Sequence, residues 1–105
     1  MKKYRTKVIF NELAKYEFED AVEFYELEQP GLGGRFKEEI KKSIKRIVEY
    51  PNAWPVERGE IRRYLVHKFP YKILYSIEKD HICIIAIAHQ HRRPNYWIDR
   101  IIDKT

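Results

Sequence analysis

Cysteine, long apolar runs and signal-like segments are almost absent from this sequence. Cys83 is the single cysteine among 105 residues, so the chain cannot form an internal disulfide, and we expect a reducing environment. No run approaches the roughly 20 apolar residues of a membrane-spanning helix. The N-terminal stretch MKKYRTKVIF is basic and has no apolar core long enough for a signal peptide. These shortages predict a cytoplasmic protein without a membrane partner.

Acidic residues are scarce in one part of the chain, residues 61–93. Seven lysines and arginines lie there against two acids, Glu78 and Asp80, and the excess equals the net charge of +5 of the whole chain. All four histidines lie in the same window. Positive charge that is confined to one segment predicts an anionic partner better than the same charge spread over a surface.

Hydrophobic periodicity predicts a strand, two helices, three strands and a short helix, in that order. Apolar residues recur at spacings of three and four in both long helices, and Asn11 is a suitable N-cap for the first. Pro51 ends the second helix, and Pro94 starts the short C-terminal helix. The expected strands are residues 3–10, 62–67, 71–77 and 82–88, and the expected long helices are residues 12–28 and 35–50.

These elements predict a single α+β domain over residues 1–105. A short connection that contains Pro30 and three glycines predicts an antiparallel helical hairpin. We expect the hairpin to pack on one face of a mostly antiparallel four-stranded sheet, whose other face has no covering layer. Residues 82–88 are apolar on both faces and are the expected central strand. Residues 51–60 are an expected loop, which Trp54 anchors to the core.

Three groups of residues occur in an order that is more specific than any one group. They are Pro30, Gly31, Leu32, Gly33, Arg35 and Phe36; Arg62, Phe69, Pro70, Tyr71, Ile73 and Tyr75; and His89, Arg92, Arg93, Pro94 and Trp97. Over almost the whole chain, their order and spacing resemble the RelE/ParE superfamily of type II toxin–antitoxin toxins. The resemblance implies a cognate antitoxin, which would neutralise the toxin with a wrapping segment of acidic and apolar residues. The oligomeric state is open between a homodimer and a toxin–antitoxin hetero-oligomer.

The resemblance also implies one of two targets. RelE-like members cut messenger RNA in the decoding site of the ribosome, whereas ParE-like members inhibit DNA gyrase and have no known chemistry. The motifs FPY and HQHRRPNYW are closer to the ParE-like branch. On this interpretation, the residues that contact the target or nucleic acid are Arg62, Arg63, Lys72, Arg92, Arg93 and Trp97.

The alternative is a ribosome-dependent messenger RNA endonuclease. Cleavage at a ribose 2′-hydroxyl needs a base, an acid and cations that stabilise the phosphorane, but no metal. The catalytic set would then be Arg63, Lys72, His89, Arg92 and Tyr96. A different nuclease set would use His67, His89 or His91 as the acid or base, and Glu57 or Glu60 could assist as a carboxylate. Leu65 and Gln90 stand where a lysine and an arginine are expected, which weakens this interpretation. A non-toxic member that binds only an antitoxin or nucleic acid is a third interpretation.

The histidines also raise the question of a metal site. His67, His89 and His91 would need a further ligand at suitable geometry, and the sequence has no zinc-binding spacing. Cys83 lies in an apolar run and is a poor candidate for that ligand. We therefore expect neither a metal nor a cofactor.

Overall fold

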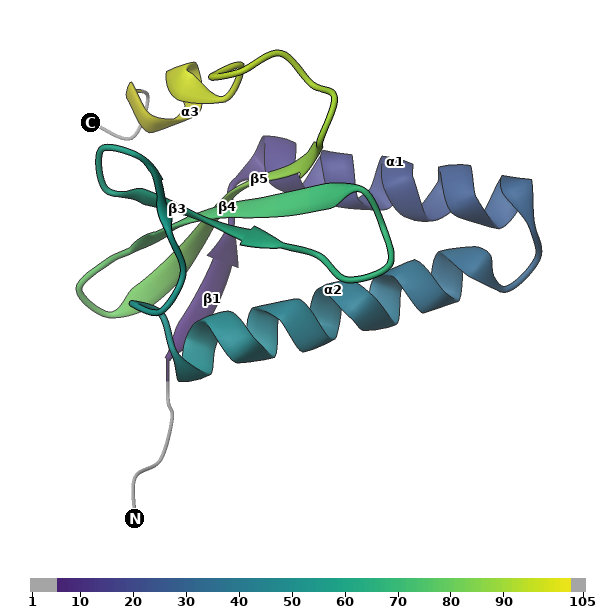
Figure 1. The fold of residues 1–105 in the computed structure, drawn as a ribbon, viewed down its shortest axis with the longest axis horizontal. Coiled ribbons are helices and arrows are strands. Elements are labelled where there is room, and N and C mark those ends of the chain that lie inside the picture. The colour runs from purple at the N-terminus through teal and green to yellow at the C-terminus, as the bar shows by residue number, and fades with distance from the viewer. Residues whose placement is uncertain (1–5, 103–105) are drawn as a thin grey trace.

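A mixed five-stranded sheet carries two long helices on one face and a short helix on the other (Figure 1). The structure is a computed structural model that describes residues 6–102. Its elements are β1 (Lys7–Phe10), α1 (Glu12–Glu28), α2 (Leu32–Glu49), β2 (Val56–Arg58), β3 (Ile61–Leu65), β4 (Tyr71–Ile77), β5 (His81–His89) and α3 (Ile98–Ile102). The strand order is β1-β5-β4-β3-β2, and only β1 and β5 are parallel neighbours.

The predicted α+β class is confirmed, but the predicted number of strands is wrong. The fifth strand, β2, lies in the segment that was expected to be a loop, and it pairs with β3. Its three residues between Pro55 and Gly59 are too few to show an alternating pattern. β3 spans Ile61–Leu65 rather than residues 62–67. Residues 3–5 of the expected first strand lie outside the described residues.

The connection between α1 and α2 is tight because glycine occupies two special positions. Gly31 has a φ of +92°, and the Glu26 carboxylate accepts hydrogen bonds from the N–H groups of Gly31 and Gly33 at 2.9 and 3.1 Å. These bonds satisfy amides at the helix start, so α2 begins at Leu32, three residues before the predicted Arg35. A Cβ on Gly33 would lie 2.6 Å from the carbonyl oxygen of Val22 in α1.

An irregularity in β5 decides which of its side chains face each layer. Leu74 pairs with Ala86 and Tyr75 pairs with Ile84, so Ile85 has no partner and forms a β-bulge. The bulge shifts the alternation by one residue. The side chains packed with the hairpin are Ile82, Ile84 and Ile87, and those packed on the other face are Cys83, Ile85 and Ala86. β5 is an interior strand, as predicted for residues 82–88.

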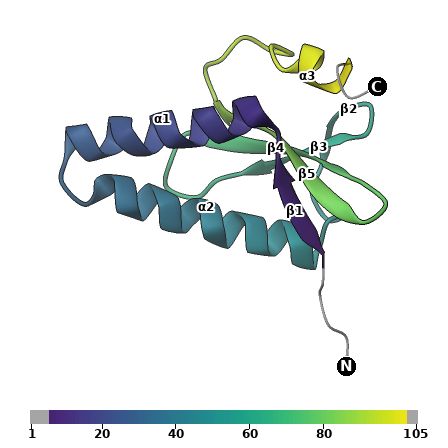
Figure 2. The ribbon, with the colours of Figure 1, turned by 180° about the vertical axis from the view of Figure 1, so that it is seen from behind.

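The face of the sheet opposite the hairpin is partly covered, contrary to the prediction. Trp97 is only 1% exposed and packs in one apolar cluster with Ile61 and Ile85. Ile98 and Ile101 of α3 lie against the same cluster. Seen from behind, the chain leaves β5 and returns over the sheet as α3, away from α2 (Figure 2). The C-terminal segment therefore completes a second, smaller core.

Candidate functional site

The cationic residues predicted from the sequence divide between the two faces of the sheet. Arg63 and Lys72 point away from the hairpin, because their strand neighbours Tyr64 and Tyr71 pack toward it. His89 lies on the hairpin face, where its ring centroid is 5.2 Å from that of Tyr71. The five residues of the predicted catalytic set are therefore not gathered in one cleft.

Glu57 of β2 lies between Arg63 and Lys72. Lys72 Nζ donates to Glu57 Oε2 at 2.9 Å, and Arg63 Nη1 lies 3.5 Å from Glu57 Oε1. The Glu57 and Lys72 side chains are 17% and 25% exposed, so this pair is only partly screened by water. Two cations around one carboxylate leave one positive charge in excess. A phosphate group that bound here would compete with Glu57 for both cations.

Arg62 and Trp54 hold the loop that precedes β2. Arg62 Nη1 donates to the carbonyl oxygen of Trp54 at 2.6 Å and to that of Asn52 at 3.4 Å. The Trp54 indole packs edge-on against Tyr64 with ring centroids 4.7 Å apart, which confirms its predicted role as an anchor. Arg62 is thus already engaged with the protein's own backbone.

The predicted residues after β5 form a second group, residues 89–96, which we call the C-terminal cationic segment. His89 Nδ1 accepts a hydrogen bond from the backbone N–H of His91 at 3.0 Å. In the neutral ring, an accepting Nδ1 places the proton on Nε2. Arg92 and Arg93 are exposed, and Arg93 forms no ion pair within residues 6–102. His89 therefore helps to shape the turn that presents these arginines.

Tyr96 is tied to α1 by its hydroxyl group. It donates to Glu17 Oε2 at 2.6 Å. Burial and this hydrogen bond raise the pKa of Tyr96 far above the ordinary value for tyrosine. The Arg92 guanidinium stacks over the Tyr96 ring at 3.8 Å from its centroid, and Arg92 Nη1 lies 4.0 Å from Glu17 Oε2. Tyr96 stays protonated at neutral pH, and its proton points to the Glu17 carboxylate.

Sequence reasoning missed two residues that support the C-terminal cationic segment from outside it, Glu17 and Arg100. Arg100 Nη2 and Nη1 donate to Glu17 Oε2 and Oε1 at 2.8 and 3.0 Å. Arg100 Nη1 also donates to the carbonyl oxygen of Ile85 at 3.0 Å. In the sequence, Glu17 is one of many acids along the first helix, and nothing marks it as the partner of a distant arginine.

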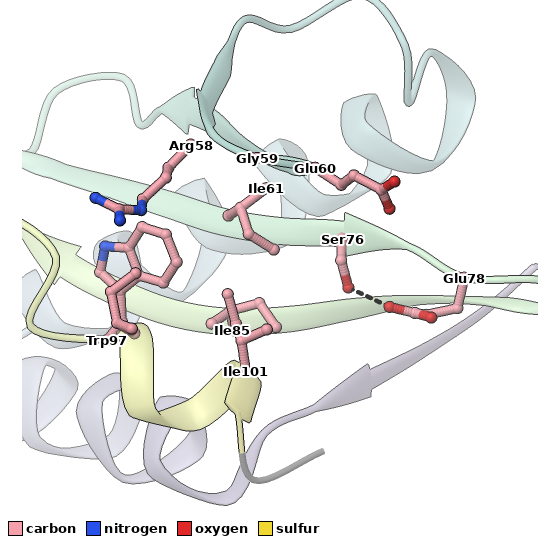
Figure 3. Close-up of a pocket in the computed structure, with 10 residues that line it drawn as sticks. Arg58, Gly59, Glu60, Ile61, Ser76, Glu78, Ile85, Trp97 and Ile101 are labelled. Atoms are coloured by element: carbon pink, nitrogen blue, oxygen red, sulfur yellow. Dashed lines mark hydrogen bonds between the residues drawn. The ribbon is translucent and has the colours of Figure 1, made fainter. Parts of the chain in front are cut away.

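An apolar pocket of ≈ 440 Å³ lies between the β2–β3 turn and α3. Figure 3 shows Ile61, Ile85 and Ile101 around it, and Ser76 Oγ donating to Glu78 Oε2 at 2.6 Å on its rim. Trp97, which was predicted to contact a target, lines this pocket and is 1% exposed. Its burial corrects that expectation, because the indole supports α3 instead of standing on the surface.

Within residues 6–102, no three His, Cys, Asp or Glu side chains are grouped so that they could hold a metal ion. In the same part of the chain, no helix is both long and apolar enough to cross a membrane.

Comparison with known proteins places this geometry in context. A family model described as the ParE toxin of type II toxin–antitoxin system, parDE, matches residues 8–94. A solved structure described as the chromosomal ParDE TA system from P. aeruginosa superposes with a TM-score of 0.72 at 14% sequence identity, covering 83% of this chain and 98% of that one. At this identity, the likeness to the solved structure shows the fold alone. No curated protein matched the chain.

Proposed function

This chain belongs to the ParE toxin family of type II toxin–antitoxin systems, and we propose that it arrests growth by inhibiting DNA gyrase until a cognate antitoxin neutralises it. The observation that carries the proposal is the separation of the predicted catalytic residues. Arg63 and Lys72 lie on one face of the sheet and His89 on the other. This arrangement favours a protein that acts by contact over one that transfers protons within a single cleft.

The pairing of the remaining candidates supports the same proposal. The Tyr96 hydroxyl donates to Glu17, and the Lys72 ammonium donates to Glu57, so neither group is free for a substrate. The messenger RNA endonuclease would need both groups to leave their carboxylates. Arg92 and Arg93 are the most available cations of the predicted set, and we assign them the main contacts with gyrase or its bound DNA.

The proposed antitoxin meets two kinds of surface. The exposed cations of residues 61–97, chiefly Arg92 and Arg93, suit an acidic segment, and complex formation through these charges should weaken as salt rises. An exposed apolar stripe runs along α1, where four large side chains are 50% to 79% exposed: Leu13, Tyr16, Phe24 and Leu27. Such a stripe suits the apolar face of a partner helix. Toxin and antitoxin would then form a hetero-oligomer.

Two cell-free assays on the purified protein without antitoxin test the proposed target. The first follows supercoiling and cleaved-complex formation by gyrase, and the second follows messenger RNA cleavage in the ribosomal decoding site. We expect gyrase inhibition with intact RNA. Replacing Arg92 and Arg93 together with glutamine should weaken inhibition by about 10-fold or more, because it removes two exposed contact charges.

Lys45→Gln is the matched control, because Lys45 is an exposed cation on the far side of the hairpin. It should inhibit gyrase like the wild-type protein. Ribosome-dependent RNA cleavage with normal gyrase activity would overturn the proposal in favour of the endonuclease. A loss of inhibition in Lys45→Gln about half as large, on a logarithmic scale, as that in the double variant would show that net charge matters and that the segment does not, because Lys45→Gln removes one charge and the double variant removes two.

A further inference from the structure

The edge of the sheet beside β1 is incomplete, and side chains complete it. β1 pairs with β5 only as far as Ile84, and Asn11 N–H makes the last bond, to the Ile84 carbonyl at 2.8 Å. β5 continues for five more residues, to His89. Beyond Ile84, the Ile87 N–H donates to Glu17 Oε1 at 2.9 Å, and the Ile85 carbonyl accepts from Arg100 at 3.0 Å. A carboxylate and a guanidinium thus take the place of the missing strand.

The Glu17 carboxylate is the centre of this arrangement. It accepts from the Ile87 backbone, from the Tyr96 hydroxyl and from two nitrogens of Arg100. The Glu17 and Arg100 side chains are 16% and 10% exposed, so they lie largely out of water. Buried charges of this kind persist where they are paired and fully hydrogen-bonded. Glu17 thereby joins α1, β5 and the C-terminal segment at one point.

Glu17 reaches Arg92 in two ways: directly, with its Oε2 4.0 Å from Arg92 Nη1, and through the ring of Tyr96. Two guanidinium groups lie over that ring, Arg92 at 3.8 Å and Arg100 at 5.0 Å from its centroid. The hydroxyl bond to Glu17 fixes the ring, and the fixed ring gives Arg92 a surface on which to stack. Arg92 itself remains 53% exposed, so its charge stays available to a partner.

We propose that Glu17 is the positioning residue of the C-terminal cationic segment. It orders Tyr96, and through Tyr96 and its own 4.0 Å contact with Arg92 it preorganises Arg92 for target contact without touching the target itself. The part of this inference that concerns the target rests on the proposed function. The part that concerns the order of residues 89–96 does not, and the two parts have separate measurements. Preorganisation of a contact residue strengthens binding by reducing the entropy lost on association.

Tyr96→Phe is the sharpest test, because it removes one hydroxyl and leaves the ring and the Glu17–Arg100 pair in place. Amide hydrogen exchange followed by NMR reports the order of residues 89–96 directly. We expect exchange there to accelerate by about 10-fold, since one charge-assisted hydrogen bond is lost. The Ile87 amide should keep its protection, because its bond to Glu17 remains. Tyr50→Phe is the control, since Tyr50 is 62% exposed at the end of α2.

A second pair of variants tests Glu17 without leaving a buried charge unpaired. Replacing Glu17 and Arg100 together with alanine should accelerate exchange of the Ile87 amide by about 10- to 100-fold, together with residues 89–96. Replacing both with glutamine restores an acceptor and should recover part of the protection. A merely structural role would predict uniform acceleration across the protein, with no such local pattern and no recovery by glutamine.

The gyrase titration supplies the functional readout. If Arg92 is only mispositioned, Tyr96→Phe should need about 5- to 10-fold more protein for half-inhibition but reach the same maximal inhibition. Unchanged exchange and unchanged inhibition in Tyr96→Phe would overturn the inference. If Tyr96→Phe loses an RNA cleavage activity of the wild-type protein while amide exchange is unchanged, Tyr96 is a catalytic acid, and this result would also overturn the inference. If the wild-type protein does not inhibit gyrase, the proposed function fails, and the exchange pattern still decides the positioning role.

Discussion

Replacing Arg100 with methionine should leave the Glu17 carboxylate buried without its main partner. The wild-type pair has N–O distances of 2.8 and 3.0 Å, and the two side chains are 16% and 10% exposed. Removal of one partner from a buried ion pair costs about 3–5 kcal/mol, because the remaining charge is uncompensated. Arg92, 4.0 Å from the same carboxylate, offsets part of the loss. We therefore expect destabilisation near the lower limit, about 3 kcal/mol.

Thermal and urea unfolding measure this loss directly. For a domain of this size, about 3 kcal/mol corresponds to a fall in Tm of roughly 12–24 °C. The double variant Glu17→Gln with Arg100→Met removes both charges and should regain at least about half of the lost stability. Glu19→Gln changes an exposed acid on the same helix and should stay within about 0.5 kcal/mol of wild type.

Two results would refute this reasoning. A loss below about 1 kcal/mol for Arg100→Met would place the pair among solvated surface ion pairs, which contribute little. A double variant as unstable as the sum of the two single variants would show that Glu17 and Arg100 do not stabilise each other. Either result would also weaken the inferred role of Glu17 in positioning Arg92.

Two further predictions concern the hairpin and the core. Gly33→Ala should destabilise the protein by about 1–3 kcal/mol, because its Cβ would lie 2.6 Å from the Val22 carbonyl oxygen. Gly34→Ala is the control and should stabilise the protein by up to about 1 kcal/mol, because a Cβ there has nothing within 4 Å. Equal effects of the two substitutions in urea unfolding would contradict the close approach at Gly33. Burial raises the pKa of Tyr75 to about 12 from 10.0, which favours the neutral phenol in the folded state. The contribution of Tyr75 to the free energy of unfolding is therefore fully present below about pH 10. As the pH rises toward about 12, up to about 2–3 kcal/mol of stability is lost. Tyr75→Phe should flatten that part of the stability curve, and an unchanged slope would argue against the shift.

The helices and most strands follow from local patterns that the sequence contains. Apolar side chains at spacings of three and four define the buried faces of α1 and α2, and Asn11 caps α1 by accepting from the Leu13 N–H at 2.9 Å. These signals act within one or two turns of chain, so they can be read without a partner. β2 carries no such signal, because its three residues gain strand geometry only from pairing with β3.

The candidate site was predictable only in part. The concentration of cations in residues 61–93 pointed to Arg92 and Arg93, which the structure leaves exposed. The same reasoning assigned Trp97 to a contact surface, but the indole completes the core under α3. Aromatic residues near a basic turn fit both roles, and only the path of the chain after β5 distinguishes them.

The sequence by itself determined every element except β2, the order of those elements, the family and the excess of positive charge, because each depends on residue type and near-neighbour spacing. The tertiary structure decided which groups meet. β1 ends at Phe10 while β5 continues to His89, so part of the edge of β5 has no strand partner. There the Ile87 N–H donates to Glu17, one of many acids of α1. Arg100 reaches that carboxylate from 83 positions away. Such a contact depends on strand lengths and on the bulge at Ile85, and neither is encoded in the vicinity of Glu17.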